Sequence, residues 1–336
     1  MKDRYSRQEL YKPIGVSGQK KIQSKHVLII GCGALGTMNA ESLVRAGIGR
    51  LSIVDRDYVE VSNLQRQQLF TEEDCLKQLP KVIAAKEHLL NINSTVTVNA
   101  YVMDGTSSNL PSLMEDVDLV IDATDNFDIR FIMNDLIHQY TIPWIFGSCV
   151  GSTGMSYTIL PQETPCLQCL LDATPVSGAT CDSVGIISPA VQMVVALQQA
   201  EALKILVEDN KSLRTKLVTF DLWNNIFHTM DLKRAKKNTC PTCGENPIYP
   251  KLTYASQTKM EVLCGRNTVQ VRSKREVHMK ELARRLSEIG TVHQNDFLLS
   301  VDYQSFRVVI FKDGRVLIHG TNSIEQARNI YYQLVG

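Results

Sequence analysis

Short apolar runs alternate with amphipathic stretches along the first half of the chain. The run His26–Ile30 is typical of a strand buried on both faces, and 37–46 that follows it has the pattern of a helix ending at Gly47. The same alternation continues to the middle of the chain, with a helix expected at 80–90 and strands at 51–55, 96–100, 118–122 and 142–146. Strands alternating with helices predict an α/β fold with a doubly wound, Rossmann-like, mostly parallel sheet.

The second half of the chain predicts a long connection and a separate small domain. Residues 162–186 are rich in Thr, Pro, Ser, Gly and Cys and are expected to form a crossover loop, followed by a helix at 189–207. Three prolines within 236–252 mark a boundary. We therefore expect a main domain at 1–250 and a small α/β accessory domain at 251–336, with a strand at 269–271, a helix at 279–289, a hairpin at 307–319 and a helix at 324–334.

Composition narrows the class of protein. Of the 336 residues 44% are hydrophobic and 21% are charged, and the net charge of +1 gives no electrostatic reason to expect a nucleic-acid partner. No apolar run reaches the length of a membrane span, and the N-terminus lacks the apolar core of a signal peptide, so we expect no membrane association and a cytoplasmic location. In that compartment the nine cysteines are better interpreted as metal ligands, nucleophiles or buried thiols than as disulfides.

A glycine motif follows the first strand. In Gly31-x-Gly33-x-x-Gly36 the missing side chains would let backbone amides approach a phosphate at the start of a helix. Asp55, at the end of the next strand, stands where a carboxylate commonly binds ribose hydroxyls. These features predict a dinucleotide or a nucleoside triphosphate about equally well.

Further polar residues favour a triphosphate. Asp57 leads into Asn63-Leu64-Gln65-Arg66-Gln67, and Lys81 and Thr124-Asp125-Asn126 come later in the chain. Arg66 and Lys81 would neutralise phosphate charge, and Asp125 would hold Mg²⁺. A dinucleotide needs no such set, so we favour ATP and Mg²⁺ over an NAD-dependent oxidoreductase.

The motifs Asn63–Gln67, Pro80-Lys81 and Thr124–Asn126 resemble those of the MoeB and ThiF adenylyltransferases of the ubiquitin-activating superfamily, and the resemblance covers about residues 4–245. It implies ATP-dependent adenylation of the C-terminal carboxylate of a small ubiquitin-like sulfur-carrier protein, and later transfer of sulfur from a donor enzyme. It also implies a homodimer in which Arg7 reaches the partner's nucleotide site. One departure is that Lys77-Gln78-Leu79 stands where the family usually has a glycine-containing turn.

Within that family we expect the molybdopterin-synthase enzyme of molybdenum cofactor synthesis, with the ThiF enzyme of thiamine thiazole synthesis as the alternative. All the motifs quoted are common to both. A non-catalytic scaffold that binds a ubiquitin-like partner is a further alternative, against which the intact Arg66, Lys81 and Asp125 speak.

Two Cys-x-x-Cys pairs offer four thiolates to one tetrahedral ion. They are separated by about 70 residues, and the family's split arrangement implies that Cys166, Cys169, Cys240 and Cys243 hold a structural Zn²⁺. Four free thiols are the alternative.

Cys181 lies in the long connection, where some relatives have a cysteine that bonds to the carrier or to a sulfur donor. Its covalent role is one hypothesis, and an inert loop thiol is the other. The C-terminal domain does not suit a rhodanese. It is interpreted as a docking or dimer-supporting module, with a sulfur relay through Cys264 as the alternative.

Overall fold

The computed structural model describes residues 4–173, 184–253, 260–263, 267–272 and 277–335. These residues divide into two compact units. The first comprises the described residues up to 253, apart from 77–79 and 184–185. The second comprises those two short segments and the described residues from 260 onward. Among the described helices, none has the length and apolar character needed to cross a membrane.

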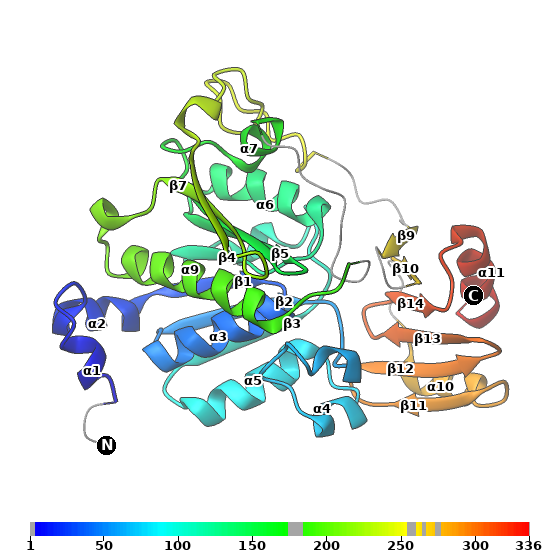
Figure 1. Cartoon of the computed structure of the whole chain (residues 1–336). Helices are drawn as coiled ribbons and strands as arrows, with labels where there is room; N and C mark the ends of the chain where they lie inside the picture. The colour runs from blue at the N-terminus through cyan, green and yellow to red at the C-terminus, as the bar shows by residue number, and fades with distance from the viewer. Residues whose placement is uncertain (1–3, 174–183, 254–259, 264–266, 273–276, 336) are drawn as a thin grey trace. The chain divides into compact units, whose positions relative to one another are not determined.

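An eight-stranded sheet forms the centre of the first unit, in the order β3-β2-β1-β4-β5-β6-β7-β8 (Figure 1). The first five strands of this order pair in parallel, and β5 through β8 pair antiparallel. The strands are β1 (His26–Ile30), β2 (Arg50–Asp55), β3 (Thr97–Val102), β4 (Leu119–Asp122), β5 (Trp144–Val150), β6 (Thr153–Ile159), β7 (Lys216–Asp221) and β8 (Ile226–Asp231).

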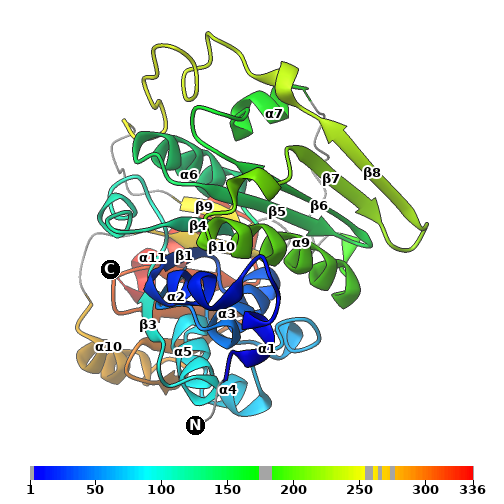
Figure 2. The same cartoon turned by 90° about the vertical axis from the view of Figure 1, so that its left-hand side faces the viewer.

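Helices cover both faces of this sheet, as Figures 1 and 2 show. Leu35 of α3 packs with Val191 and Val194 of α9 on one face, and Met133 and Leu136 of α6 pack with apolar strand residues on the other. The helices of the unit are α1 (Ser6–Glu9), α2 (Gly15–Ser24), α3 (Ala34–Ala46), α4 (Glu72–Leu76), α5 (Lys81–Ile92), α6 (Phe127–Gln139), α7 (Leu167–Ala173) and α9 (Ser188–Leu206), with short 3₁₀ turns at Val61–Asn63, Pro111–Leu113, Asn210–Ser212 and Lys233–Ala235.

The second unit is a six-stranded antiparallel sheet in the order β11-β12-β13-β14-β10-β9. Apolar residues of its strands form one core with Leu282 and Leu286 of α10 and with Ile330 and Leu334 of α11. Its elements are β9 (Met260–Leu263), β10 (Thr268–Val271), α10 (Met279–Leu286), β11 (Thr291–Gln294), β12 (Leu298–Tyr303), β13 (Phe306–Phe311), β14 (Val316–His319) and α11 (Ile324–Leu334).

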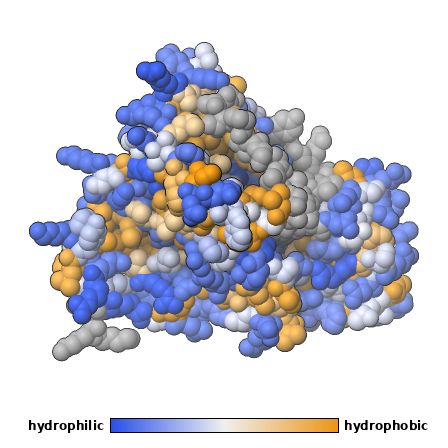
Figure 3. All heavy atoms as spheres, in the orientation of Figure 1, coloured by the Kyte–Doolittle hydropathy of each residue, from blue (hydrophilic) through white to orange (hydrophobic). Residues whose placement is uncertain are grey.

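The predicted doubly wound α/β class and the small C-terminal α/β unit are confirmed. Helix α3 begins three residues before the predicted Thr37, and it ends as expected at Gly47, whose φ is +84°. The stretch predicted as an irregular connection contains helix α7. On the face drawn in Figure 3 hydrophilic and hydrophobic residues are interspersed.

Candidate active site

The glycine loop lies between β1 and α3, and its three glycines have different tasks. Gly31 has a φ of +97°, and a Cβ there would overlap the carbonyl of Ala123. A Cβ on Gly36 would overlap the carbonyl of Gly31. By contrast, a Cβ on Gly33 would find only the Gln67 side chain, 3.8 Å away. Two glycines therefore serve packing, while the third leaves open space beside the backbone, which fits the approach of a phosphate.

The loop lies at the point where the strand order reverses. The chain runs from β1 outward to β2 and β3, and then returns to β4 on the other side of β1. In open α/β sheets the crevice at the carboxyl ends of strands flanking such a point is the usual ligand site. The segments that follow β1, β2 and β4 carry Gly31, Asp57 and Asp125, so the topology brings the predicted residues to one edge.

Asp55 is bonded to the glycine loop. Its carboxylate accepts a hydrogen bond from the Cys32 amide at 2.5 Å and another from the Asp57 amide at 2.7 Å. Burial raises the pKa of Asp55, an effect that the charge of Lys81 opposes and that of Asp57 reinforces. The predicted ribose ligand is thus held beside the predicted phosphate loop.

Lys81 is buried against a second carboxylate. Its Nζ lies 3.2 Å from Oδ2 of Asp57, and only 3% of its side chain is exposed. Its amide also donates to the Asp57 carbonyl at 2.9 Å, which fixes the start of α5 beside the end of β2. Asp55 and Asp57 therefore form one cluster with Lys81, which is distant from them in the sequence. Gln78 takes a φ of +47°, a left-handed conformation at the turn where the family usually has glycine.

The Asn63–Gln67 segment contains Gln67, a candidate for ligand contact whose role the sequence alone did not indicate. Asn63 is buried, and its Oδ1 accepts the Glu60 amide at 3.2 Å. Arg66 is partly exposed, and its guanidinium donates to the Ser62 carbonyl at 2.9 Å. Gln67 is 3% exposed, and its Oε1 finds no hydrogen-bond partner among the described residues. A buried, unsatisfied amide oxygen next to Gly33 marks Gln67 as an additional candidate for ligand contact.

Asp125 and Asn126 lie on the loop between β4 and α6. Asp125 is exposed, and Asn126 caps α6 through its Oδ1, which accepts the Asp128 amide at 2.7 Å. A capping role explains Asn126 without a ligand, whereas an exposed carboxylate at this edge is suited to a cation.

The N-terminal arm is anchored through the neighbours of Arg7. Asn93 donates to the Tyr5 hydroxyl at 2.9 Å, and Gln8 donates to the Ala46 carbonyl at 3.0 Å. Arg7, on α1, is exposed. These two hydrogen bonds hold α1 in place, and neither of them involves Arg7.

The four predicted zinc ligands lie together. Their sulfur atoms are all within 4.8 Å of one another, with Cys166 3.6 Å from Cys240 and Cys169 3.7 Å from Cys243. Tetrahedral zinc with Zn–S bonds of about 2.3 Å requires sulfur separations of roughly 3.8 Å. The donor set therefore fits Zn²⁺. Hydrogen bonds from Cys166 and then Cys243 lower the pKa of Cys169.

Helix α6 supports both segments that carry these cysteines. Asn134 accepts the Leu167 amide at 2.8 Å, next to Cys166. Asp135 accepts the Thr242 hydroxyl at 2.6 Å and the Lys251 amide at 2.7 Å. Burial raises the pKa of Asp135, and the Thr242 hydrogen bond opposes that effect.

Two cysteines singled out in the sequence, Cys181 and Cys264, lie outside the described residues. Their hypotheses therefore stay predictions.

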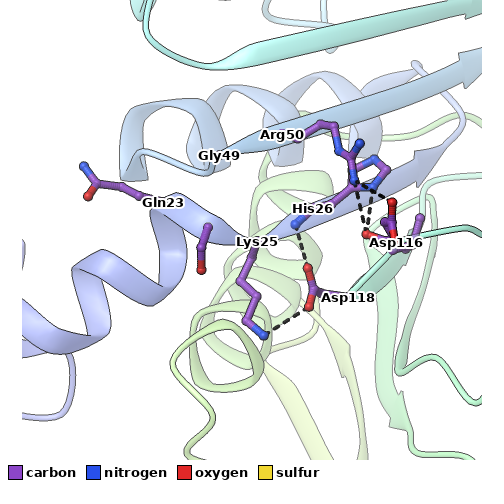
Figure 4. A pocket seen from close by; sticks show the side chains of 9 residues that line it. Gln23, Lys25, His26, Gly49, Arg50, Asp116 and Asp118 are labelled. Atoms are coloured by element: carbon purple, nitrogen blue, oxygen red, sulfur yellow. Dashed lines mark hydrogen bonds and ion pairs between the residues drawn. The ribbon is translucent and has the colours of Figure 1, made fainter.

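A pocket of about 480 Å³ lies away from this site (Figure 4). It is lined by residues at the amino ends of β1, β2 and β4, the opposite edge of the sheet. Its charged groups satisfy one another: Lys25 bonds Asp118 at 3.0 Å, and His26 contacts the Asp116 carbonyl at 3.0 Å and Ser52 at 2.8 Å. These interactions join the ends of neighbouring strands, so the polar groups of this pocket have a structural role.

Residues 5–242 match the ThiF family. The chain belongs to the ThiF/MoeB family of adenylyltransferases. It is 50% identical to the sulfur carrier protein ThiS adenylyltransferase of Bacillus subtilis over 100% of both chains. It is 34% identical to the sulfur carrier protein adenylyltransferase of Thermus thermophilus, over 78% of this chain and 96% of that one.

Other relatives match only part of the chain. Adenylyltransferase and sulfurtransferase MOCS3 of Anopheles gambiae is 36% identical over 74% of this chain and 56% of its own length. Among solved structures, Escherichia coli MccB with ATP has a TM-score of 0.63 at 23% identity, covering 73% of this chain and 74% of MccB. That likeness shows the fold alone.

Proposed function

We propose that this protein uses Mg²⁺ and ATP to adenylate the C-terminal carboxylate of a ThiS-type sulfur carrier in thiamine thiazole synthesis. The supporting observation is the 50% sequence identity to the ThiS adenylyltransferase of Bacillus subtilis. The alignment covers 100% of both chains and therefore includes the second unit. The MOCS3 match covers only 74% of this chain. The comparison thus favours the thiazole alternative over the molybdopterin carrier that we expected from the sequence.

The reaction needs no general base, because a C-terminal carboxylate is already ionised at neutral pH. A carboxylate oxygen forms a bond to the α-phosphorus of ATP, the bond from that phosphorus to the bridging β-phosphate oxygen breaks, and pyrophosphate leaves. The products are an acyl-adenylate and pyrophosphate. Catalysis then rests on orientation and on stabilising charge on the phosphates.

The residues of the candidate site divide these tasks. Asp55 binds the ribose hydroxyls, and the backbone at Gly33 approaches the phosphates. Lys81 and Arg66 neutralise phosphate charge, and Asn63 donates near the α-phosphate. The burial of Lys81 beside Asp57 supports its part, since a desolvated ammonium interacts more strongly with an anion.

Asp125 is the proposed Mg²⁺ ligand. When bound, Mg²⁺ would neutralise the phosphates, which it prefers to hold together with one or two carboxylates. The exposed position of Asp125 at the carboxyl edge of the sheet leaves its oxygens accessible to such an ion.

We also propose a homodimer with composite sites, in which Arg7 serves the partner's nucleotide. Its exposure on an anchored helix supports this role. Mixing an Arg7→Ala protein with an Asp125→Ala protein tests it: activity should return in the mixture, because one site of each heterodimer has both residues. Two inactive proteins that stay inactive after proven subunit exchange would contradict it.

In this proposal residues 1–250 carry adenylation, the four cysteines hold a structural Zn²⁺, and residues 251–336 form an accessory domain. A separate sulfur-donating enzyme would convert the acyl-adenylate to a thiocarboxylate.

The test is ATP–pyrophosphate exchange with purified carriers. Exchange with ThiS and not with the small subunit of molybdopterin synthase is expected. Exchange with the latter alone would assign the protein to the molybdopterin pathway. A folded, zinc-loaded protein that gives no exchange with either would refute the proposal.

A further inference from the structure

A buried ion pair closes the loop that carries Asp125. Asp122 is the last residue of β4, and Arg130 lies in the first turns of α6. Nε of Arg130 is 2.8 Å from Oδ2 of Asp122, and the two side chains are only 4% and 1% exposed. Residues 123–126 are therefore the loop spanned by this pair.

Both partners also bind the backbone of the loop. Asp122 Oδ1 accepts the Thr124 amide at 2.9 Å and its hydroxyl at 2.7 Å. Arg130 Nη2 donates to the Thr124 carbonyl at 2.7 Å. The amide, hydroxyl and carbonyl of the residue directly before Asp125 are thus all engaged by one ion pair.

The guanidinium is itself held in place. It donates to the Gly147 carbonyl of β5 at 3.0 Å, and the rings of Phe127 and Phe146 each lie 5.1 Å from its central carbon. Only the planar fork of arginine can donate to a carboxylate and two carbonyls from one position, which a lysine ammonium on a flexible stem does not reproduce. Stability alone explains such a pair poorly, because burying two charges costs desolvation and apolar replacements are often at least as stable.

We propose that Arg130 is a positioning residue for the adenylation reaction: it fixes the 123–126 loop so that Asp125 meets the metal and the phosphates. The inference rests on the proposed function, since it assigns Arg130 to the same site. Arg130 itself contacts neither substrate nor metal and acts through the backbone of Thr124.

The experiment measures pyrophosphate exchange by the full-length protein as a function of Mg²⁺ concentration, with ATP and ThiS saturating. For Arg130→Lys we expect a loss of about 100-fold in kcat and a rise of about tenfold in the Mg²⁺ concentration for half-maximal exchange. The matched control is Arg214→Lys. Arg214 is half-buried in the same unit, donates to the Ser156 hydroxyl at 3.0 Å, and makes no hydrogen bond to the 123–126 loop. Its Mg²⁺ dependence should equal that of the wild type.

Thr124→Val is the second variant, because it retains the ion pair and the shape of the side chain but removes the hydroxyl bond to Asp122. A rise of about threefold in the Mg²⁺ requirement is expected, less than the roughly 10- to 100-fold effect of losing a whole outer-shell partner, because the amide and carbonyl of Thr124 stay bonded. If Arg130→Lys is folded and needs no more Mg²⁺ than the wild type, positioning by Arg130 is refuted while the proposed function stands. If Arg130→Lys does not fold, a wild-type Mg²⁺ curve for Thr124→Val refutes it instead. A wild-type protein without exchange would remove the proposed function and this inference together.

Discussion

The three glycines of the nucleotide loop should separate folding from ligand binding when each is replaced by alanine. Gly33 has a φ of −86° and a ψ of −145°, a combination outside the main regions for residues with a Cβ, and its added methyl would meet only the Gln67 side chain, 3.8 Å away. Alanine at this N-cap position should therefore cost about 1–2 kcal/mol, from the lost capping preference and the unfavourable ψ. Gly36→Ala, in contrast, sets a methyl against the backbone carbonyl of Gly31, and overpacking that cannot relax costs about 3 kcal/mol or more.

These free energies translate into distinct melting temperatures. For a unit of this size each kcal/mol shifts Tm by about 2–4 °C. Gly33→Ala should therefore lose roughly 2–8 °C and Gly36→Ala roughly 6–12 °C or more, and because the same factor applies to both variants, Gly36→Ala should melt at the lower temperature. The methyl added in Gly33→Ala would occupy the space assigned to a phosphate. We therefore expect the KM of this variant for ATP to rise by about tenfold or more, which corresponds to about 1.4 kcal/mol of lost binding.

The assay pairs thermal unfolding followed by circular dichroism with pyrophosphate exchange at varied ATP. A Gly33→Ala protein that keeps the wild-type KM would refute the assignment of that open space to the phosphates. A Gly33→Ala protein as unstable as Gly36→Ala would show instead that Gly33 serves packing.

Three further predictions concern other parts of the first unit. Asp125→Ala should lose pyrophosphate exchange by at least about 100-fold with a nearly unchanged Tm, because the side chain is exposed; normal exchange would remove Asp125 from the site. Cys240→Ser should lower both the zinc content measured by mass spectrometry and the Tm, since structural zinc contributes folding energy, whereas a metal-free wild type of equal Tm would argue for four plain thiols. Burial, aided by the charge of Arg50, lowers the pKa of His26 in the folded protein. As the pH falls below about 6.5, His26 therefore becomes protonated in the unfolded chain before it does so in the folded protein. Stability from neutral His26 should thus be complete above that pH and decline below it; urea midpoints from pH 8 to pH 5 should fall less steeply for His26→Gln, and parallel curves would refute the assignment.

The parallel half of the sheet was predictable because its strands have strong local patterns. His26–Ile30 is apolar apart from its first residue and is buried at every position. Strand β8 could not be found this way, because all six of its residues are exposed and it is defined by its pairing with β7. Helix α7 was also not predicted, because it is short and overlaps the Cys166–Cys169 pair. Its buried Leu167 lies between these two cysteines, and its buried Leu170 follows Cys169.

The candidate site shows a similar division. Asp55, Lys81 and the four cysteines belong to recognisable spacings, and the structure brings each group together. Arg130 and Gln67 escaped assignment because their significance depends on burial. An arginine in a helix is usually on a solvated surface, and only the fold shows that Arg130 is 3% exposed.

Helix α6 is held at two places, by Arg130 to the Asp125 loop and by Asn134 and Asp135 to the segments that carry the cysteines. It connects the proposed reactive centre with the proposed site of a structural Zn²⁺. Inhibition by a chelator would therefore have two origins, direct withdrawal of Mg²⁺ and slower release of Zn²⁺. Only the first should be reversed at once when Mg²⁺ is restored. Loss of activity in a Cys166 or Cys240 variant would then report the loss of Zn²⁺ and is no sign of a covalent sulfur intermediate, whose candidates are Cys181 and Cys264.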